Sequence, residues 1–197
     1  MTKVKICGLK EAAHVVAAVE AGADAVGFVF AKSKRQITPA QAHELAKHVP
    51  ENVLKVGVFV NETAETMNDI AKTVPLDVIQ LHGDESQALI EQLQFPTIKA
   101  IGVKTPADVA TLAHYDTDYV LVDAPVAGSG ETFDWSLLET TYPNLILAGG
   151  LNNENITSAL KKVAPYMVDV SSGVETDGVK DSAKIARFIA AVKGEIL

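Results

Sequence analysis

Cysteine is nearly absent from this sequence, since Cys7 is the single cysteine among 197 residues. A lone cysteine excludes an internal disulfide and is typical of proteins from a reducing compartment. The N-terminus lacks the long apolar run of a signal peptide, and no apolar stretch reaches the ~18 residues of a transmembrane helix. We therefore expect a cytoplasmic protein that has no membrane partner.

Positive charge is also scarce, because 17 lysines and arginines face 25 aspartates and glutamates, for a net charge of −8. The basic residues form no cluster beyond Lys32, Lys34 and Arg35, which argues against nucleic acid as the main partner. A site for an anionic ligand must therefore obtain its positive potential from a few cations and from helix N-termini.

No linker, composition break or low-complexity tract divides the chain. Hydrophobic residues make up 48% of the sequence and charged residues 21%, as in ordinary globular proteins. A chain of this length suits one domain with a sizeable core. We therefore predict that residues 1–197 form a single domain.

Short apolar segments alternate with segments of helical periodicity along the whole chain. The apolar segments predict strands at Val4–Cys7, Ala25–Phe30, Leu54–Val60, Asp77–Leu81, Thr97–Val103, Tyr119–Val122, Asn144–Ala148 and Tyr166–Val170. The periodic segments predict helices at Glu11–Ala21, Pro39–His48, Glu62–Thr73, Glu85–Leu93, Pro106–His114, Trp135–Glu139, Asn153–Val163 and Asp181–Val192.

Strict alternation of strand and helix implies a parallel sheet with right-handed crossovers. Eight such repeats favour an α/β fold of the closed (β/α)₈ type, the TIM barrel, although ~250 residues are typical of that fold. An open doubly wound sheet is the alternative. The first strand-to-helix turn, at Gly8, lacks the G-x-G-x-x-G pattern that such a sheet often carries.

In a barrel, the C-terminal ends of the strands and the loops that follow them form the active-site face. Gly149-Gly150 and Ser172-Gly173 occupy the loops after the seventh and eighth predicted strands. Barrels often bind phosphate there, because glycine lets backbone N–H groups approach an anion. We predict phosphate binding, the alternative being that these glycines only turn the chain.

A glycine-rich loop follows the sixth predicted strand. Gly128, Ser129 and Gly130 form its centre, and segments of this kind often close over a substrate. We predict a lid loop here, and an ordinary flexible loop is the alternative.

Two strand ends carry residues suited to acid–base chemistry. Asp123 follows the sixth predicted strand, and a carboxyl group that is partly removed from water can donate a proton near neutral pH. Cys7 ends the first strand, with Lys5 on the same face, and the lysine could favour the thiolate form. The alternatives are a buried structural cysteine and an aspartate that caps a turn.

Several blocks together resemble the phosphoribosylanthranilate isomerase family, in the right order over essentially the whole chain. The blocks are Lys5-Ile6-Cys7-Gly8-Leu9, Gln80-Leu81-His82-Gly83-Asp84-Glu85, Val122-Asp123-Ala124, Gly128-Ser129-Gly130 with Phe133-Asp134-Trp135, Ala148-Gly149-Gly150-Leu151, and Asp169-Val170-Ser171-Ser172-Gly173-Val174-Glu175. Any one block is weak, whereas their combination is specific.

The resemblance implies a step of tryptophan biosynthesis that needs no cofactor and no metal. In this step N-(5-phosphoribosyl)anthranilate, a small molecule, rearranges to 1-(2-carboxyphenylamino)-1-deoxyribulose 5-phosphate. By the same resemblance, Cys7 is the general base and Asp123 is the general acid. The cysteine acts without forming a covalent intermediate.

The resemblance also implies three residues that contact the substrate. Arg35 is suited to the anthranilate carboxylate, because a guanidinium binds a carboxylate bidentately. Asp169 matches a carboxylate near the substrate amine or sugar hydroxyls, and His82 lies in a shared block. The alternatives are a solvated basic loop for Arg35, a structural acid for Asp169 and a satisfied histidine at the rim for His82.

Two other functions compete with this interpretation. A histidine-pathway sugar-phosphate isomerase runs the same rearrangement on a barrel, but would be expected to use two aspartates, so Cys7 speaks against it. A non-catalytic sensor of sugar phosphates would be expected to lose the acid or the base, yet both Cys7 and Asp123 are present. The sequence is compatible with a monomer and with a homodimer.

Overall fold

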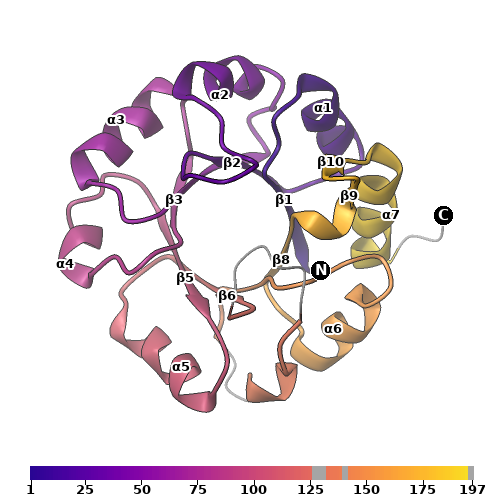
Figure 1. Cartoon of the computed structure of the whole chain (residues 1–197). Coiled ribbons are helices and arrows are strands. Elements are labelled where there is room, and N and C mark those ends of the chain that lie inside the picture. Colours follow the sequence, from indigo (N-terminus) through magenta and orange to yellow (C-terminus); the bar gives the residue numbers. More distant parts are fainter. Residues whose placement is uncertain (126–131, 139–141, 195–197) are drawn as a thin grey trace.

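The computed structural model describes residues 1–125, 132–138 and 142–194. Its centre is a closed barrel in which each strand pairs in parallel with the next and β8 returns to β1. Figure 1 shows this ring of strands with the helices around its outside. The strands are β1 Lys3–Cys7, β2 Ala25–Val29, β3 Leu54–Phe59, β4 Val78–Leu81, β5 Thr97–Gly102, β6 Tyr119–Asp123, β7 Leu145–Leu147 and β8 Met167–Val170. The predicted (β/α)₈ barrel is confirmed, and the open sheet is excluded.

The helices connect successive strands and cover the outer face of the barrel (Figure 1). They are α1 Ala12–Glu20, α2 Pro39–Ala46, α3 Ala64–Thr73, α4 Gln87–Ile90, α5 Pro106–Ala110, α6 Ile156–Val163 and α7 Ser182–Lys193, with short 3₁₀ turns η1 Thr111–His114, η2 Trp135–Leu137 and η3 Ser172–Val174. Several begin at a capping side chain, as α2 does at Thr38 and α7 at Asp181. None of the helices in the described ranges is long and apolar enough to cross a membrane.

Three helices begin two or three residues later than predicted: α3 at Ala64, α4 at Gln87 and α6 at Ile156. We expected a helix from Glu85 to Leu93, but α4 begins at Gln87, after the cap Ser86, and ends at Ile90. The Glu85 carboxylate is instead buried and accepts hydrogen bonds from Lys99 and from the backbone N–H of Asn61. A side chain held in this way anchors the loop after β4 to its neighbours.

The helices predicted before and after β6 are shorter or tighter than expected. The turn of helix predicted at Trp135–Glu139 is the 3₁₀ turn η2, and the end of the segment Pro106–His114 is the 3₁₀ turn η1. A short antiparallel hairpin of β9 Glu175–Thr176 and β10 Val179–Lys180 follows β8 and was not predicted. Strands of two residues carry no alternation that a sequence could reveal.

Alternation along the strands divides the interior into an apolar and a polar part. The predicted faces of β1 are confirmed, because Val4 and Ile6 belong to the core between strands and helices while Lys5 points into the barrel. A second apolar cluster fills the barrel itself. Along their strands, the polar residues Gln80, Asp123 and Asp169 each lie two positions after a member of that cluster: Val78, Leu121 and Met167. The barrel interior therefore becomes polar toward the C-terminal ends of its strands.

Candidate active site

A buried lysine organises the polar part of the barrel. Lys5 is fully buried, and its Nζ donates to Asp169 Oδ1 at 3.0 Å and to Gln80 Oε1 at 2.9 Å. Burial opposes the charge on Lys5, but the adjacent Asp169 and Cys7 outweigh it and raise the Lys5 pKa. The ammonium group therefore stays charged inside the barrel.

Cys7 ends β1 beside this lysine and is only 8% exposed. Burial raises the pKa of the Cys7 thiol above its ordinary value, while the positive charge of Lys5 acts in the opposite direction. Neighbouring strand β2 leaves room for the sulfur, because a Cβ at Gly27 would lie 2.8 Å from Cys7 Sγ. Lys5 lowers the pKa of Cys7, as expected, but burial raises that pKa by more.

Asp123 ends β6 on the inner side of the barrel and is 8% exposed. Its Oδ1 accepts the backbone N–H of Ala124 at 2.7 Å, and its Oδ2 lies 3.3 Å from Nε2 of His82. The other ring nitrogen of His82, Nδ1, lies 3.1 Å from Nε2 of Gln80. A continuous polar chain thus links Asp169, through Lys5, to Asp123.

The Arg35 guanidinium is bonded to the hairpin that follows β8. Arg35 donates from Nε and Nη2 to the two carboxylate oxygens of Glu175, at 2.7 and 2.9 Å. Lys180 Nζ adds a contact of 2.8 Å to Glu175 Oε1 and also donates to the carbonyl of Ser171. Burial opposes the ionised form of Glu175, but Arg35 and Lys180 outweigh it and lower the Glu175 pKa to about 2.

Glycines bring the loops after β7 and β8 into close contact. Gly149 and Gly150 both have positive φ, at 84° and 60°, where glycine carries no steric penalty. A Cβ at Gly149 would meet the Ala124 backbone, and one at Gly173 would collide with the carbonyl of Leu151. Ser172 begins η3 beside Gly173. The predicted lid residues Gly128, Ser129 and Gly130 lie outside the described residues.

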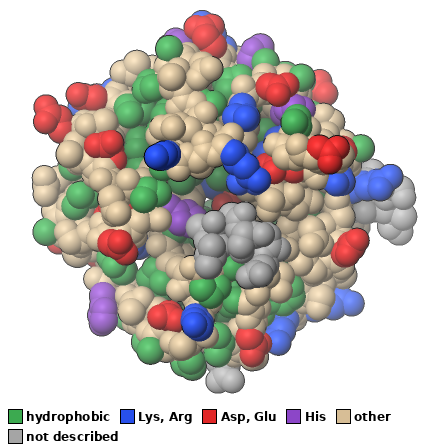
Figure 2. Space-filling model, viewed as in Figure 1, with side chains coloured by type: hydrophobic (Ala, Val, Ile, Leu, Met, Phe, Trp, Pro, Cys, Tyr) green, Lys and Arg blue, Asp and Glu red, His purple; other side chains and the backbone are tan. Residues whose placement is uncertain are grey.

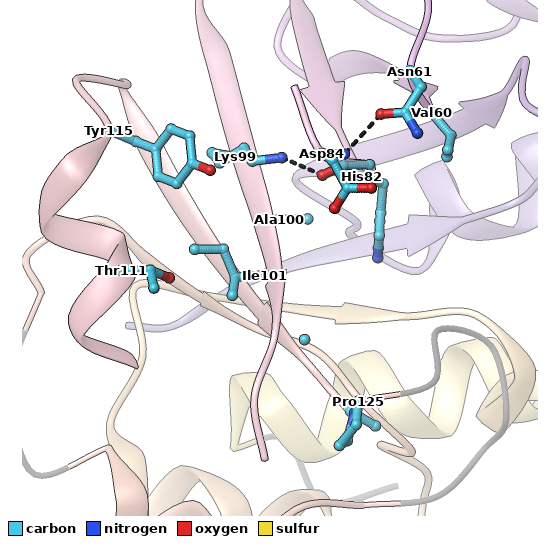
Figure 3. Close-up of a pocket in the computed structure, with 13 residues that line it drawn as sticks. Val60, Asn61, His82, Asp84, Lys99, Ala100, Ile101, Thr111, Tyr115 and Pro125 are labelled. Atoms are coloured by element: carbon cyan, nitrogen blue, oxygen red, sulfur yellow. Dashed lines mark hydrogen bonds between the residues drawn. The ribbon is translucent and has the colours of Figure 1, made fainter. Parts of the chain in front are cut away.

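A cavity of about 540 Å³ opens beside this polar chain, over the ends of β4, β5 and β6. Figure 3 shows that Lys99 reaches from β5 toward the loop after β4, which carries His82 and Asp84. Figure 2 shows basic side chains beside the centre of the viewed face, while acidic side chains are scattered mainly around its edge. In the described ranges no group of three or more His, Cys, Asp or Glu side chains is arranged to hold a metal ion.

The structure thus brings Cys7, Asp123, His82 and Asp169 to the C-terminal end of one barrel interior. Arg35 lies at its edge, because a Cβ at Gly8, the residue after Cys7, would lie 2.5 Å from Arg35 Cδ. Sequence reasoning assigned no role to Gln80, Glu175 or Lys180. Gln80 and Glu175 lie inside sequence blocks that resemble the isomerase family, whereas nothing in the sequence around Lys180 distinguishes it.

Acidic, basic and thiol groups at the C-terminal ends of barrel strands define an enzyme of the (β/α)₈-barrel class. The family model of "N-(5'phosphoribosyl)anthranilate (PRA) isomerase" matches residues 4–191. The chain belongs to this family of isomerases.

Similar proteins agree with this assignment over nearly the full length of the chain. An N-(5'-phosphoribosyl)anthranilate isomerase of Streptococcus mutans serotype c is 53% identical over 195 residues, covering 98% of this chain and 100% of its own. The crystal structure of phosphoribosyl anthranilate isomerase from Thermotoga maritima is 43% identical, with a TM-score of 0.92 and coverage of 98% and 100%. A phosphoribosyl anthranilate isomerase in complex with reduced 1-(o-carboxyphenylamino)-1-deoxyribulose 5-phosphate is 43% identical, with a TM-score of 0.89 and the same coverage.

Proposed function

We propose that this chain converts N-(5-phosphoribosyl)anthranilate to 1-(2-carboxyphenylamino)-1-deoxyribulose 5-phosphate, a step of tryptophan biosynthesis. The observation that carries the proposal is the pair of groups at the ends of β1 and β6. Cys7 supplies a thiol and Asp123 a carboxyl group inside the same barrel mouth, in a chain of the isomerase family. An acid and a base are what this rearrangement requires.

Asp123 acts first, as the general acid. Its carboxyl proton passes to the ribose ring oxygen, the bond from C1 to that oxygen breaks, and the nitrogen lone pair forms a protonated Schiff base. The carboxylate that remains has a hydrogen bond from the Ala124 N–H and a histidine nitrogen at 3.3 Å. Both contacts favour the ionised product of this step.

Cys7 acts second, as the general base. The thiolate removes the proton from C2, the C–H electron pair forms the C1–C2 double bond, and the C=N electrons return to nitrogen. The resulting enolamine tautomerises to the ketone. The positive charge of Lys5 stabilises the thiolate and opposes the burial that raises the Cys7 pKa. The narrow space beside Gly27 fixes the position of the Cys7 sulfur.

Two groups of residues hold the ends of the substrate. Arg35 binds the carboxylate of the anthranilate ring, either alongside the Glu175 carboxylate that it holds in this structure or in place of it. Gly149, Gly150, Ser172 and Gly173 bind the phosphate through backbone N–H groups of two loops that touch each other. Asp169 and His82 face the sugar between these two ends.

The test is turnover of phosphoribosylanthranilate generated in situ, followed through the loss of its fluorescence, with the product identified by chromatography. We expect turnover by the wild-type chain in the presence of a chelator, because every group used above belongs to the protein. Absence of turnover contradicts the proposal. Turnover of the histidine-pathway aminoaldose phosphate in its place would favour the competing isomerase.

A further inference from the structure

Gln80 is a buried amide that the reaction above does not use. It is 1% exposed and lies inside the barrel on β4, between a lysine and a histidine. Burying an amide group without hydrogen-bond partners costs free energy. Both polar ends of the Gln80 amide have a partner. Its carbonyl oxygen accepts from Lys5 at 2.9 Å, and its nitrogen lies 3.1 Å from His82 Nδ1.

The direction of these hydrogen bonds is fixed by chemistry. An ammonium group has three donors and no acceptor, so Lys5 requires that Gln80 turn its Oε1 toward it. The Nε2 of the same amide then faces His82, and an amide nitrogen only donates. His82 Nδ1 must therefore accept, which means that it carries no proton.

This restricts the ionisation of His82. A neutral imidazole with a free Nδ1 carries its proton on Nε2, and Nε2 lies 3.3 Å from Oδ2 of Asp123. A proton on Nδ1 would point at the N–H of the Gln80 amide, and two donors facing each other repel. The contact to Asp123 is longer than a good hydrogen bond, as is common for catalytic contacts before the substrate binds.

We propose that Gln80 is a positioning residue that holds His82 as the neutral Nε2–H tautomer and directs that N–H at the carboxyl group of Asp123. The consequence for catalysis rests on the proposed function. A neutral N–H stabilises the Asp123 carboxylate once its proton has left. An imidazolium in the same place would favour the carboxylate before the substrate arrives and so would remove the acid.

Several other charged groups lie near Gln80 and His82 and can affect the pH dependence of His82 ionisation. They are Lys5 and Cys7 on β1, Asp169 on β8, Asp123 on β6, Asp84 on the loop after β4, and the Lys99–Glu85 pair behind that loop. Lys5 and Asp169 neutralise each other at 3.0 Å, as do Lys99 and Glu85 at 2.8 Å. Asp123 is the carboxylate in direct contact with the imidazole.

The first test is ¹⁵N NMR of the histidine side chains, with His82 identified by the loss of its signals in His82→Asn. The wild-type chain should show His82 as the neutral Nε2–H tautomer at pH 7. In Gln80→Glu, a carboxylate can accept from Nδ1–H, so His82 should become charged and titrate about 1 to 3 pH units higher. An Nδ1–H tautomer or an imidazolium in the wild type, or an unchanged midpoint in Gln80→Glu, overturns the proposal.

The second test is the pH dependence of kcat/KM. Gln80→Glu should move the limb set by Asp123 to lower pH by about 1 to 3 units. The limb set by Cys7 should not move in that direction, because the new carboxylate lies against Lys5 and weakens the support that Lys5 gives to the thiolate. The matched control is Asn68→Asp, the same change at a buried amide that bonds Gln92 and Gln94 away from the barrel mouth. The control should lose stability with an unchanged pH profile, and equal shifts in both variants overturn the proposal.

The two tests separate this proposal from the proposed function. The NMR result on the wild-type chain needs neither a substrate nor a folded Gln80 variant. If the tautomer is as expected but phosphoribosylanthranilate is not turned over, the proposed function fails and the role of Gln80 toward His82 stands. If turnover is observed but His82 has the other tautomer, only the role of Gln80 fails.

Discussion

Arg35 and Glu175 form a bidentate ion pair at the mouth of the barrel. Arg35 has 11% and Glu175 6% of its side chain exposed, and two hydrogen bonds join them in the bidentate geometry of a guanidinium and a carboxylate. Lys180 makes a second contact to the same carboxylate. Glu175 therefore joins the β9–β10 hairpin to the loop after β2 and holds Arg35 in place.

Glu175→Gln should destabilise the fold at neutral pH by roughly 3 kcal/mol, because it leaves two buried cations without their carboxylate. The folded pKa of about 2 lies below the ~4.3 of an unfolded glutamate. The contribution of Glu175 is therefore complete above about pH 4.5 and is lost as the pH falls toward 2. Denaturant unfolding at pH 7 and pH 3 measures the difference between wild type and variant. A difference that does not narrow at pH 3 contradicts the assignment.

Arg35→Lys tests whether the guanidinium recognises the carboxylate of the substrate. Lysine keeps the charge but loses the fork of two donors, so KM should rise about 10- to 100-fold, the equivalent of one charged hydrogen bond, with a smaller change in kcat. Lys34→Gln is the control, since Lys34 is the exposed neighbouring cation. Equal effects of the two substitutions would show that only overall charge matters.

At the scale of elements, the strands were predictable and several loops were not. The apolar runs located every barrel strand to within two residues, because strands that are covered on both faces are mostly apolar along their length. The start of α4 was wrong, because Glu85 serves a tertiary ion pair with Lys99 instead of a helical turn. The same holds for the candidate site. Cys7 and Asp123 were predictable because they stand at strand ends, whereas the role of Gln80 was not, because its contacts form only when the barrel closes.

Glu85→Gln tests how the loop after β4 is held. Glu85 is buried, and it bonds Lys99 and the backbone of Asn61 and Gly83. The substitution leaves the Lys99 ammonium buried without its carboxylate, so the free energy of unfolding should fall by about 3 to 5 kcal/mol. Glu51→Gln, at an exposed glutamate, should change it by less than about 0.5 kcal/mol. Similar losses in both variants would contradict a structural role for the buried pair.

At the scale of the whole molecule, closure of the barrel is what creates the site. Strand β8 pairs with β1 so that Lys5 lies opposite Asp169, residues that are 164 positions apart in the chain. The same closure surrounds Cys7 and Asp123 with groups from distant strands. The candidate acid and base belong to separate halves of the sequence and share one environment only in the folded barrel.

The most direct measurement is the rate of phosphoribosylanthranilate turnover by the wild-type chain, Cys7→Ser and Asp123→Asn under identical conditions. The account predicts an active wild type and a loss of ~10²- to 10⁴-fold in kcat for each variant, the usual range for a missing general base or acid. Unfolding curves show whether each variant retains the fold. A folded Cys7→Ser or Asp123→Asn variant with nearly wild-type turnover would contradict the assignment of that residue.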